Sequence, residues 1–364
     1  SGHIAGYTPQ MNFKTTLMTS NLLLGGTEEF PLHVNEDGTF SVNIPTPYIR
    51  AVSIYSSFMN SLFFIKPGET TFVEINLAEF SREESRIHHS SPSLGDKYFF
   101  SGALADLNNS LANSSIKELP IGFSSQEEYQ EMLKAASDMT PEQYKAYWIE
   151  RFENSIKALD KHPELTNSMR DFLIMNAKLD LALECIAAGG ILTDACKQKH
   201  NIEKETLLPD SLKPVFTKEY YDFLPKLIPT NSSILYLNKS HFCLSDLSDI
   251  TLDGIPLLPN DKDAKETLFA ELMGSSGADF LYKLINARNL AAPIKNFTPL
   301  TDNQLADIGK ISPEIQKYFT LLNEDLKQTI EDNKKKTDYI VNPVDTKGIP
   351  NEDLFAAITQ PYRG

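Results

Sequence analysis

The stretch Phe-Pro-Leu-His-Val-Asn-Glu-Asp-Gly-Thr-Phe-Ser-Val-Asn-Ile, residues 30–44, decides the first part of the fold. Residues 39–44 alternate polar and apolar side chains, which is the period of a β-strand with one buried face. Residues 30–34 alternate in the same way, less regularly. The segment Asn35-Glu36-Asp37-Gly38 consists of turn formers, and its glycine can take a positive φ. The stretch therefore predicts a β-hairpin.

Further short strands are predicted on the C-terminal side of this hairpin. Residues 51–55 and 61–65 are rich in β-branched and aromatic side chains. The turn Lys66-Pro67-Gly68-Glu69 then separates residues 61–65 from a strand at residues 71–77, which predicts a second hairpin. Short strands at close spacing are typical of an antiparallel β-sandwich or a small barrel. We expect such a domain over residues 1–80.

The hydrophobic period changes to that of helices after a polar segment. Residues 81–97 contain five serines and only two aliphatic residues, so we expect a linker over residues 81–99. Thr140-Pro141-Glu142-Gln143 is a capping box with proline at the first helical position. A second capping box starts at Thr301. Gly189-Gly190 is expected to end the predicted helix that lies directly before these two glycines.

The sequence therefore predicts an α+β fold, with an N-terminal antiparallel β-domain followed by a multi-helix domain. The apolar stripes of the predicted helices are too short to be stable alone, so they must pack on one another. We place this helical domain at residues 100–336. Residues 337–364 carry little periodicity and are expected to form a connector, with one short helical candidate at residues 351–358.

Composition excludes several classes of partner. The 364 residues include 34 Lys and Arg against 49 Asp and Glu, which gives a formal charge of −15. Such a chain repels phosphate backbones and anionic lipid, so nucleic-acid partners are not expected. Hydrophobic residues make up 41%, which is sufficient for packed cores. The sequence contains no apolar run of the roughly 18 residues that a membrane-spanning helix needs.

The three cysteines form no Cys-x-x-Cys pair. A disulfide between Cys185 and Cys196 is geometrically possible, but ordinary buried thiols are favoured because free cysteine behaves as a small hydrophobe. Cys243 follows His241 by two residues and is a conceivable nucleophile. A Cys-His pair also needs an orienting group and an oxyanion donor, and the sequence indicates neither.

Other polar clusters have ordinary structural explanations. His88-His89 has no further ligands at metal-site spacing, and residues 249–260 resemble a calcium loop without its bidentate glutamate. Two groups of charged residues are expected to complement helix dipoles. They are Glu127, Glu128 and Glu131 near the start of one predicted helix, and Lys334–Lys336 near the C-terminal end of another. Nucleotide-binding loops, serine-hydrolase elbows and zinc-protease motifs are absent. We therefore predict no catalytic residue, no cofactor-binding residue, no cofactor and no metal ligand.

Four segments carry a resemblance to a known family. They are residues 35–40, with an Asp-Gly-x-Phe turn; residues 63–69, with a Pro-Gly-Glu turn; residues 100–108; and residues 354–364. In this order they resemble the N-terminal region of exported TlpA/ResA-like thiol-disulfide oxidoreductases, in which a β-rich domain and a helical segment precede a thioredoxin fold. The resemblance covers nearly the whole chain. The family's Trp-Cys-x-x-Cys centre does not occur, so no catalytic residue can be assigned from the resemblance.

The resemblance implies a non-catalytic accessory region, which positions a downstream thioredoxin-like domain of the same polypeptide or recognises its exported substrate proteins. It also implies a periplasmic or cell-envelope location and a possible lipid anchor upstream. One alternative is an independent envelope module that binds a peptide or glycan through Tyr48, Tyr55, Phe58, Phe63 and Phe64. Another is a hydrolase that uses Cys243 or a pair of carboxylates.

Overall fold

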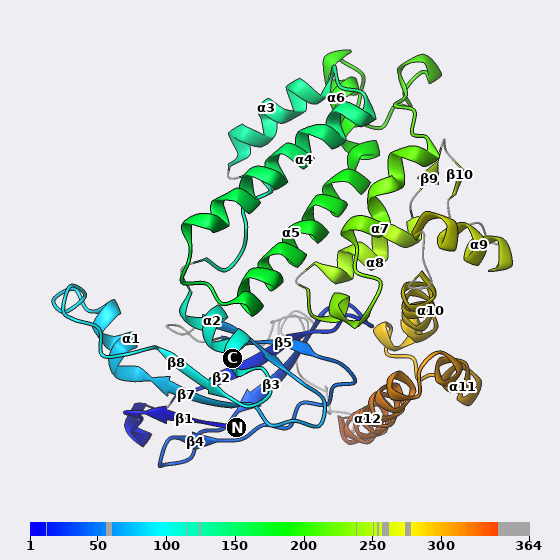
Figure 1. Cartoon of the computed structure of the whole chain (residues 1–364). Helices are drawn as coiled ribbons and strands as arrows, with labels where there is room; N and C mark the ends of the chain where they lie inside the picture. The colour runs from blue at the N-terminus through cyan, green and yellow to red at the C-terminus, as the bar shows by residue number, and fades with distance from the viewer. Residues whose placement is uncertain are drawn as a thin grey trace, which may run out of the picture.

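The computed structural model describes residues 1–340 apart from 12, 56–59, 115, 124, 238, 250, 253–254, 257–261 and 274–277. Two β-sheets form the N-terminal part, and a multi-helix region follows them in sequence and in space (Figure 1). The predicted α+β class is therefore confirmed. The predicted helix at residues 351–358 lies outside the described residues.

Each N-terminal sheet has four strands. The first sheet has the order β4 (Thr39–Phe40), β1 (Gly2–Ala5), β7 (Phe72–Asn76), β8 (Tyr98–Ser101). The second sheet has the order β3 (Thr27–Leu32), β2 (Thr15–Ser20), β5 (Arg50–Tyr55), β6 (Asn60–Ile65). Strands β1 and β7 pair in parallel, and the other neighbours in both sheets pair antiparallel.

The two sheets pack face to face around one hydrophobic core. Alternate residues of each strand point inward, as the period of a half-buried strand requires. Both sheets contribute to this core: Ile4, Phe40, Val73, Ile75, Tyr98 and Phe100 from the first, and Leu17, Leu32, Val52, Ile54 and Phe63 from the second. The N-terminal part is thus a two-layer sandwich.

The strand partners of both predicted hairpins are wrong, although both turns form and Val34 pairs with Phe40 in an isolated antiparallel bridge across the first turn. Gly38 has φ 84° and donates its N–H to Asn35 O at 2.9 Å. However, β3 belongs to the second sheet and β4 to the first, and β4 ends at Phe40 rather than at residue 44. The turn at residues 66–69 likewise joins β6 of one sheet to β7 of the other. Turn residues set a change of direction, but they do not determine which sheet receives the next strand.

Helix α2 (Ala105–Asn113) closes one edge of the sandwich. Edge strands β6 and β8 both present backbone groups on this side. Asn108 accepts from Phe64 N at 2.7 Å and donates to Phe64 O at 2.9 Å. The adjacent Asn109 makes the same pair of bonds with Phe100, at 2.6 and 2.8 Å. Two neighbouring amides therefore satisfy two strand edges that would otherwise be open to further pairing.

The predicted linker contains regular structure at both ends. Helix α1 spans Leu77–Glu84, and Asn76 caps it by accepting from Glu79 N. At the other end of the linker, β8 begins at Tyr98 and joins the first sheet. Glu79 is buried, and its ion pair with Arg82 gives this serine-rich segment a polar centre on which it can order.

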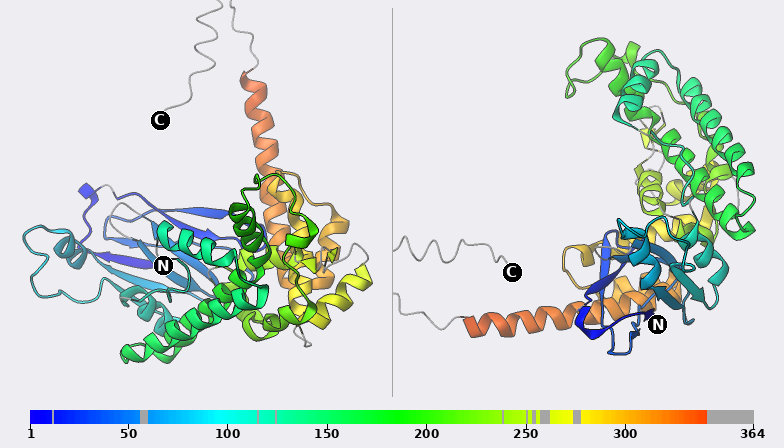
Figure 2. Two further views of the ribbon diagram at one scale, coloured as in Figure 1. Left: turned by 90° about the horizontal axis from the view of Figure 1, so that it is seen from above. Right: turned by 90° about the vertical axis from the view of Figure 1, so that its left-hand side faces the viewer.

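The remaining helices form a curved layer beside the sheets, and α12 extends from it as a long rod (Figure 2). They are α3 (Gln126–Ala136), α4 (Pro141–Ala158), α5 (Asn167–Ile186), α6 (Ala188–Lys199), α7 (Leu224–Leu227), α8 (Ser240–Asp249), α9 (Lys262–Met273), α10 (Ala278–Lys295), α11 (Asp302–Ile311) and α12 (Pro313–Ile340). The short strands β9 (Thr251–Leu252) and β10 (Ile255–Pro256) pair between α8 and α9.

Helix starts agree with the sequence better than helix ends do. Both predicted capping boxes form, at Thr140 with Gln143 and at Thr301 with Gln304. Gly189-Gly190, by contrast, lies in the first turn of α6, because α5 already ends at Ile186. Helix α12 continues to Ile340 and so includes the first residues of the predicted connector.

Candidate functional site

The most specialised part of the described structure is the junction between the second sheet and the helices. The loop at residues 21–26 joins β2 to β3, and we call it the junction loop. Its Leu22 and Leu23 are buried in the helical core rather than in the sandwich core. Asn21 Oδ1 accepts from Leu23 N at 3.0 Å and from Leu24 N at 2.9 Å, which folds the loop into a compact plug. The sheet is thus anchored by apolar side chains inserted among the helices.

A buried polar network lies behind the junction loop. The Arg50 side chain is fully buried, and its Nη2 is 2.6 Å from Glu28 Oε2. The same nitrogen also donates to Thr19 Oγ1 and, at 3.2 Å, to Ser20 O. A guanidinium taken out of water must be paired and hydrogen-bonded in this way.

The network reaches α12 through a tyrosine. Tyr318 donates its hydroxyl to Glu28 Oε1 at 2.9 Å, and Asn21 Nδ2 contacts both that oxygen and the tyrosine oxygen at 2.8 Å. We call Thr19, Asn21, Glu28, Arg50 and Tyr318 the Arg50 network. Burial raises the pKa of Tyr318, so its hydroxyl stays neutral and acts as a donor to the carboxylate.

A further amide fixes α12 to the segment before α11. Asn323 is buried, accepts from Leu300 N at 2.7 Å and donates to Leu300 O at 3.1 Å. Phe319, one residue after Tyr318, is fully buried in the helical core. The first part of α12 is therefore held on one side by the second sheet and on the other by its neighbouring helices.

The structure places the candidate thiols away from any reactive environment. Cys185 and Cys243 are buried, and burial raises the pKa of each thiol to about 12. Cys196 is half-buried, and its Sγ lies 3.7 Å from Leu212 O. All three cysteines are free, so Cys185 and Cys196 are not a disulfide pair.

The suggested Cys-His pair is not assembled. His241 Nδ1 lies 3.0 Å from Arg288 Nη2, and the imidazole packs against Gly25 of the junction loop. Burial and the nearby Arg288 lower the pKa of His241, which favours its neutral form. The histidine therefore belongs to the contact between helices and sheet, whereas Cys243 is in the helical core.

The other polar candidates lie apart from one another. His88 and His89 are exposed, and Arg82 donates to the backbone oxygen of His89 at 2.7 Å. Glu127 and Glu128 lie in the first turn of α3, as expected for the helix dipole. The calcium-loop-like segment 249–260 lies partly outside the described residues. Within the described residues, no group of three or more His, Cys, Asp or Glu side chains could hold a metal ion.

One acidic pair has no counterpart among the predicted candidates. Asp180 and Glu184 lie one turn apart on α5, and burial raises the pKa of both carboxyls. Lys239 lies 3.0 Å from Asp180 Oδ1 and neutralises part of this charge. The sequence signal was the i, i+4 spacing of two acidic residues, which places them on one face of the helix. Pairing with Lys239 gives the site a structural explanation.

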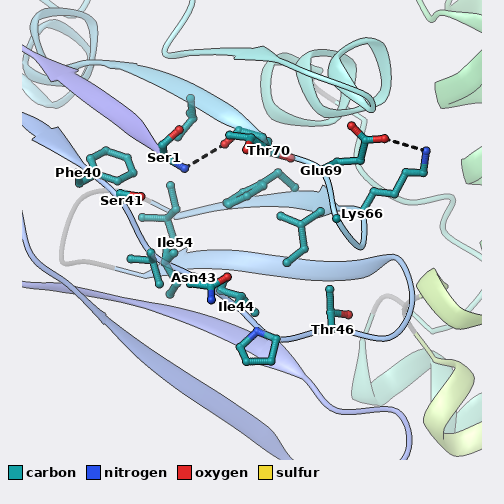
Figure 3. A pocket seen from close by; sticks show the side chains of 18 residues that line it. Ser1, Phe40, Ser41, Asn43, Ile44, Thr46, Ile54, Lys66, Glu69 and Thr70 are labelled. Atoms are coloured by element: carbon teal, nitrogen blue, oxygen red, sulfur yellow. Dashed lines mark hydrogen bonds and ion pairs between the residues drawn. The ribbon is translucent and has the colours of Figure 1, made fainter. Parts of the chain in front are cut away.

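A cavity of about 690 Å³ opens between the two sheets (Figure 3). Its inner wall is apolar and includes Ile54 and Phe63 of the second sheet. Residues 41–46 line one side, and Lys66 and residues 68–71 line the other. The ion pair between Lys66 and Glu69 belongs to this lining, with Nζ and Oε1 3.4 Å apart.

Among the described residues, no helix combines the length and apolar character needed to cross a bilayer. The chain was compared with protein-family models, with curated proteins and with solved structures, and none of the three comparisons found a match.

Proposed function

We propose that this chain is the non-catalytic accessory region of an exported thioredoxin-like disulfide reductase. In this proposal the sandwich and the helices form one rigid body, and α12 holds the redox domain in a fixed position relative to it. The observation that carries the proposal is the Arg50 network, which ties the second sheet to α12. The family itself is proposed on the resemblance of residues 35–40, 63–69, 100–108 and 354–364 to the TlpA/ResA-like proteins.

Helix α12 is suited to hold an attached domain at a distance. Its first part is fixed by Tyr318, Phe319 and Asn323, all of which are buried. The described residues after Asn323 are exposed or half-buried and project beyond the body (Figure 2). Residues 324–340 span about 25 Å at 1.5 Å per residue. A straight helix anchored at one end transmits the orientation of the body to its other end.

The state of the thiols supports a non-catalytic role. A redox cysteine must be exposed and have a lowered pKa, because the thiolate is the reactive form. Cys185 and Cys243 have the opposite properties. Cys196 has no partner thiol, because the other two cysteines of the chain are buried elsewhere in the helical core.

The alternative of a peptide- or glycan-binding module gains no support from its aromatic residues. Tyr48, Phe63 and Phe64 are buried, and Tyr48 uses its hydroxyl to accept from Leu22 N at 3.1 Å. Phe58 lies outside the described residues, and the side chain of Tyr55 is not described. We therefore propose no second function.

The proposal is tested by reducing insulin with the 364-residue chain and with the complete product of its gene. We expect no turnover by the chain and turnover by a product that carries a Trp-Cys-x-x-Cys downstream. In that product, Tyr318→Phe should lower kcat/KM for a protein disulfide and leave the rate with a small disulfide unchanged. Asp307→Asn, at an exposed ion pair of α11, is the matched control. Insulin reduction by the 364-residue chain itself, or a complete gene product without a thiol pair, would contradict the proposal.

A further inference from the structure

The tip of the junction loop rests on a histidine of α8. Gly25 has φ 70°, which lies in the left-handed region that favours glycine. A Cβ atom added at Gly25 would lie 2.6 Å from His241 Cε1 and 3.2 Å from its Nε2, so the imidazole packs directly on the backbone of the loop. The position of the loop tip therefore depends on the position of the His241 ring.

A buried arginine of α10 is hydrogen-bonded to the same ring. Arg288 Nη2 lies 3.0 Å from His241 Nδ1, and Arg288 Nη1 donates to the His241 backbone oxygen at 3.3 Å. A guanidinium only donates hydrogen bonds, so Nδ1 must be the acceptor. The imidazole is then neutral and carries its proton on Nε2. This contact therefore exists in only one protonation state of His241.

Arg288 has no carboxylate beside it that could compensate a second positive charge. Its side chain is buried, and its Nε has no hydrogen-bond partner among the described residues. Tyr48 and Cys243 are the described groups that act on its charge. Burial raises the pKa of each of these two groups to about 12, so both are neutral.

The charges that act on His241 are also positive. Among the described residues they are Arg288 and Lys295, which both lie on α10. Burial and these two cations lower the pKa of His241 below its ordinary 6.5. A proton on this imidazole is therefore opposed from the side of α10.

The other elements near His241 supply no compensating charge. On α8, Asp246 acts on Cys243 and is not among the charges that act on His241. On the second sheet, Glu28 is paired with Arg50. Residues 21–26 of the junction loop contain no charged side chain.

We propose that the contact between the junction loop and α8 opens when His241 takes up a proton. A proton on Nδ1 removes the acceptor for Arg288 Nη2 and places a cation next to a guanidinium that has no counter-ion. Arg288 is buried and also donates to Ser245 Oγ at 3.0 Å, so the half-buried His241 ring is the group that moves. Gly25 then loses the ring on which it packs.

The response to pH is local. A histidine whose pKa is lowered in the closed contact binds a proton more readily when the contact is open, so the open form gains population as the pH falls below 6.5. The Arg50 network contains no histidine, and the sheet stays attached through it. The proposal goes beyond the proposed function, because it requires no redox domain.

The test measures amide hydrogen exchange at Leu24 and Gly25 in the 364-residue chain and in its His241→Asn variant. Both amides are hydrogen-bonded inside the loop, to Asn21 Oδ1 at 2.9 Å and to Asn21 O at 2.7 Å. The loop sequence is the same in both proteins, so the ratio of their exchange rates at one pH cancels the chemical rate. Asparagine offers Arg288 an acceptor but takes up no proton.

We expect this ratio, the 364-residue chain over the variant, to rise by about tenfold between about pH 7.5 and about pH 5.5. His162→Asn is the matched control, because His162 lies between α4 and α5 in an ion pair with Glu164 at 2.9 Å. It should keep the pH dependence of the 364-residue chain. An NMR titration of the His241 ring in the 364-residue chain should give a midpoint below 6.5, and it needs no variant.

Three outcomes would overturn the proposal. The first is the same exchange ratio at both pH values. The second is loss of the pH dependence in His162→Asn, which would assign the response to another histidine. The third is a His241 ring that titrates at 6.5 or above, because the contact with Arg288 would then not oppose its proton.

Discussion

The two sheets of the sandwich differ in how their strands end. Every strand of the second sheet has six residues, and this sheet continues into the helices through the junction loop and Arg50. The strands of the first sheet have two to five residues. The cavity is lined partly by residues 41–46, which follow the two-residue strand β4. The second sheet is therefore held by contacts with the helices, whereas the first sheet is held by short ladders and by the core that it shares with the second sheet.

Loss of Glu28 should have the largest effect on stability. Glu28→Ala leaves the Arg50 guanidinium buried without its carboxylate, and removing one partner of a buried pair costs about 3–5 kcal/mol. The free energy of unfolding from urea denaturation measures this loss. Asp307→Ala, at an exposed pair with Lys310, should cost about 0–1 kcal/mol. Equal losses in the two variants would show that the network does not hold the junction.

Truncation of a buried leucine in the junction loop should have the next largest effect on stability. Leu23 is fully buried among helical side chains, so Leu23→Ala should lower the free energy of unfolding by about 2–4 kcal/mol. Leu207 is 84% exposed, and Leu207→Ala should change it by less than about 0.5 kcal/mol. A Leu23→Ala variant as stable as the natural chain would mean that the loop does not anchor the second sheet.

A substitution at the sandwich edge that α2 closes should have a smaller effect on stability. Asn108→Ala leaves the N–H and C=O of buried Phe64 without their partner, at a cost of about 1–3 kcal/mol. Asn113 is exposed and donates to Tyr98 O at 3.0 Å, so Asn113→Ala should cost less. Thermal denaturation compares the two variants. Equal costs would contradict the role given to Asn108 in closing the edge.

The smallest effects are expected from pH, and they have opposite signs at two carboxyls. Hydrogen bonds from Arg82 and Leu94 N lower the pKa of Glu79 to about 2, from an ordinary 4.5. Its contribution is therefore present above pH 4.5 and is lost as the pH falls toward 2. Burial raises the pKa of Glu184, so this residue destabilises the fold as the pH rises above 4.5.

The melting temperature between pH 2 and pH 7 measures both effects. Glu79→Gln should make the melting temperature depend less on pH below about 4.5, because the glutamine side chain takes up no proton in this range. Glu184→Gln should raise the melting temperature at pH 7 more than at pH 4. The same pH profile in both variants and the natural chain would refute both assignments.

Local patterns predicted the elements better than their partners. The capping residues Thr140 and Thr301 act within one turn, so the sequence was sufficient to find both helix starts. The choice of sheet for β4 and β7 depends on contacts far along the chain, and the predicted pairing of β3 with β4 and of β6 with β7 failed for that reason. Helix α1 was missed because its polar centre, Glu79 with Arg82, becomes visible only in three dimensions.

The junction was not predicted because its members are distant in sequence. Tyr318 contacts Glu28 across 290 residues. One local signal was available: Arg50 lies at an inward-facing position of an alternating run that continues with Val52 and Ile54. A charged residue at such a position needs a buried partner, although the sequence does not say which. The thiols were predicted better, since free cysteines were favoured over a disulfide between Cys185 and Cys196.

A distance between two spin labels tests most directly whether the Arg50 network holds α12 rigidly on the second sheet. The labels would be attached at Lys14→Cys, before β2, and Lys334→Cys, on α12, in a Cys196→Ser background; both positions are exposed. We expect one narrow distance distribution, which broadens when Glu28→Ala is added. A distribution that is already broad in the parent protein, or one that Glu28→Ala leaves unchanged, would contradict a rigid junction.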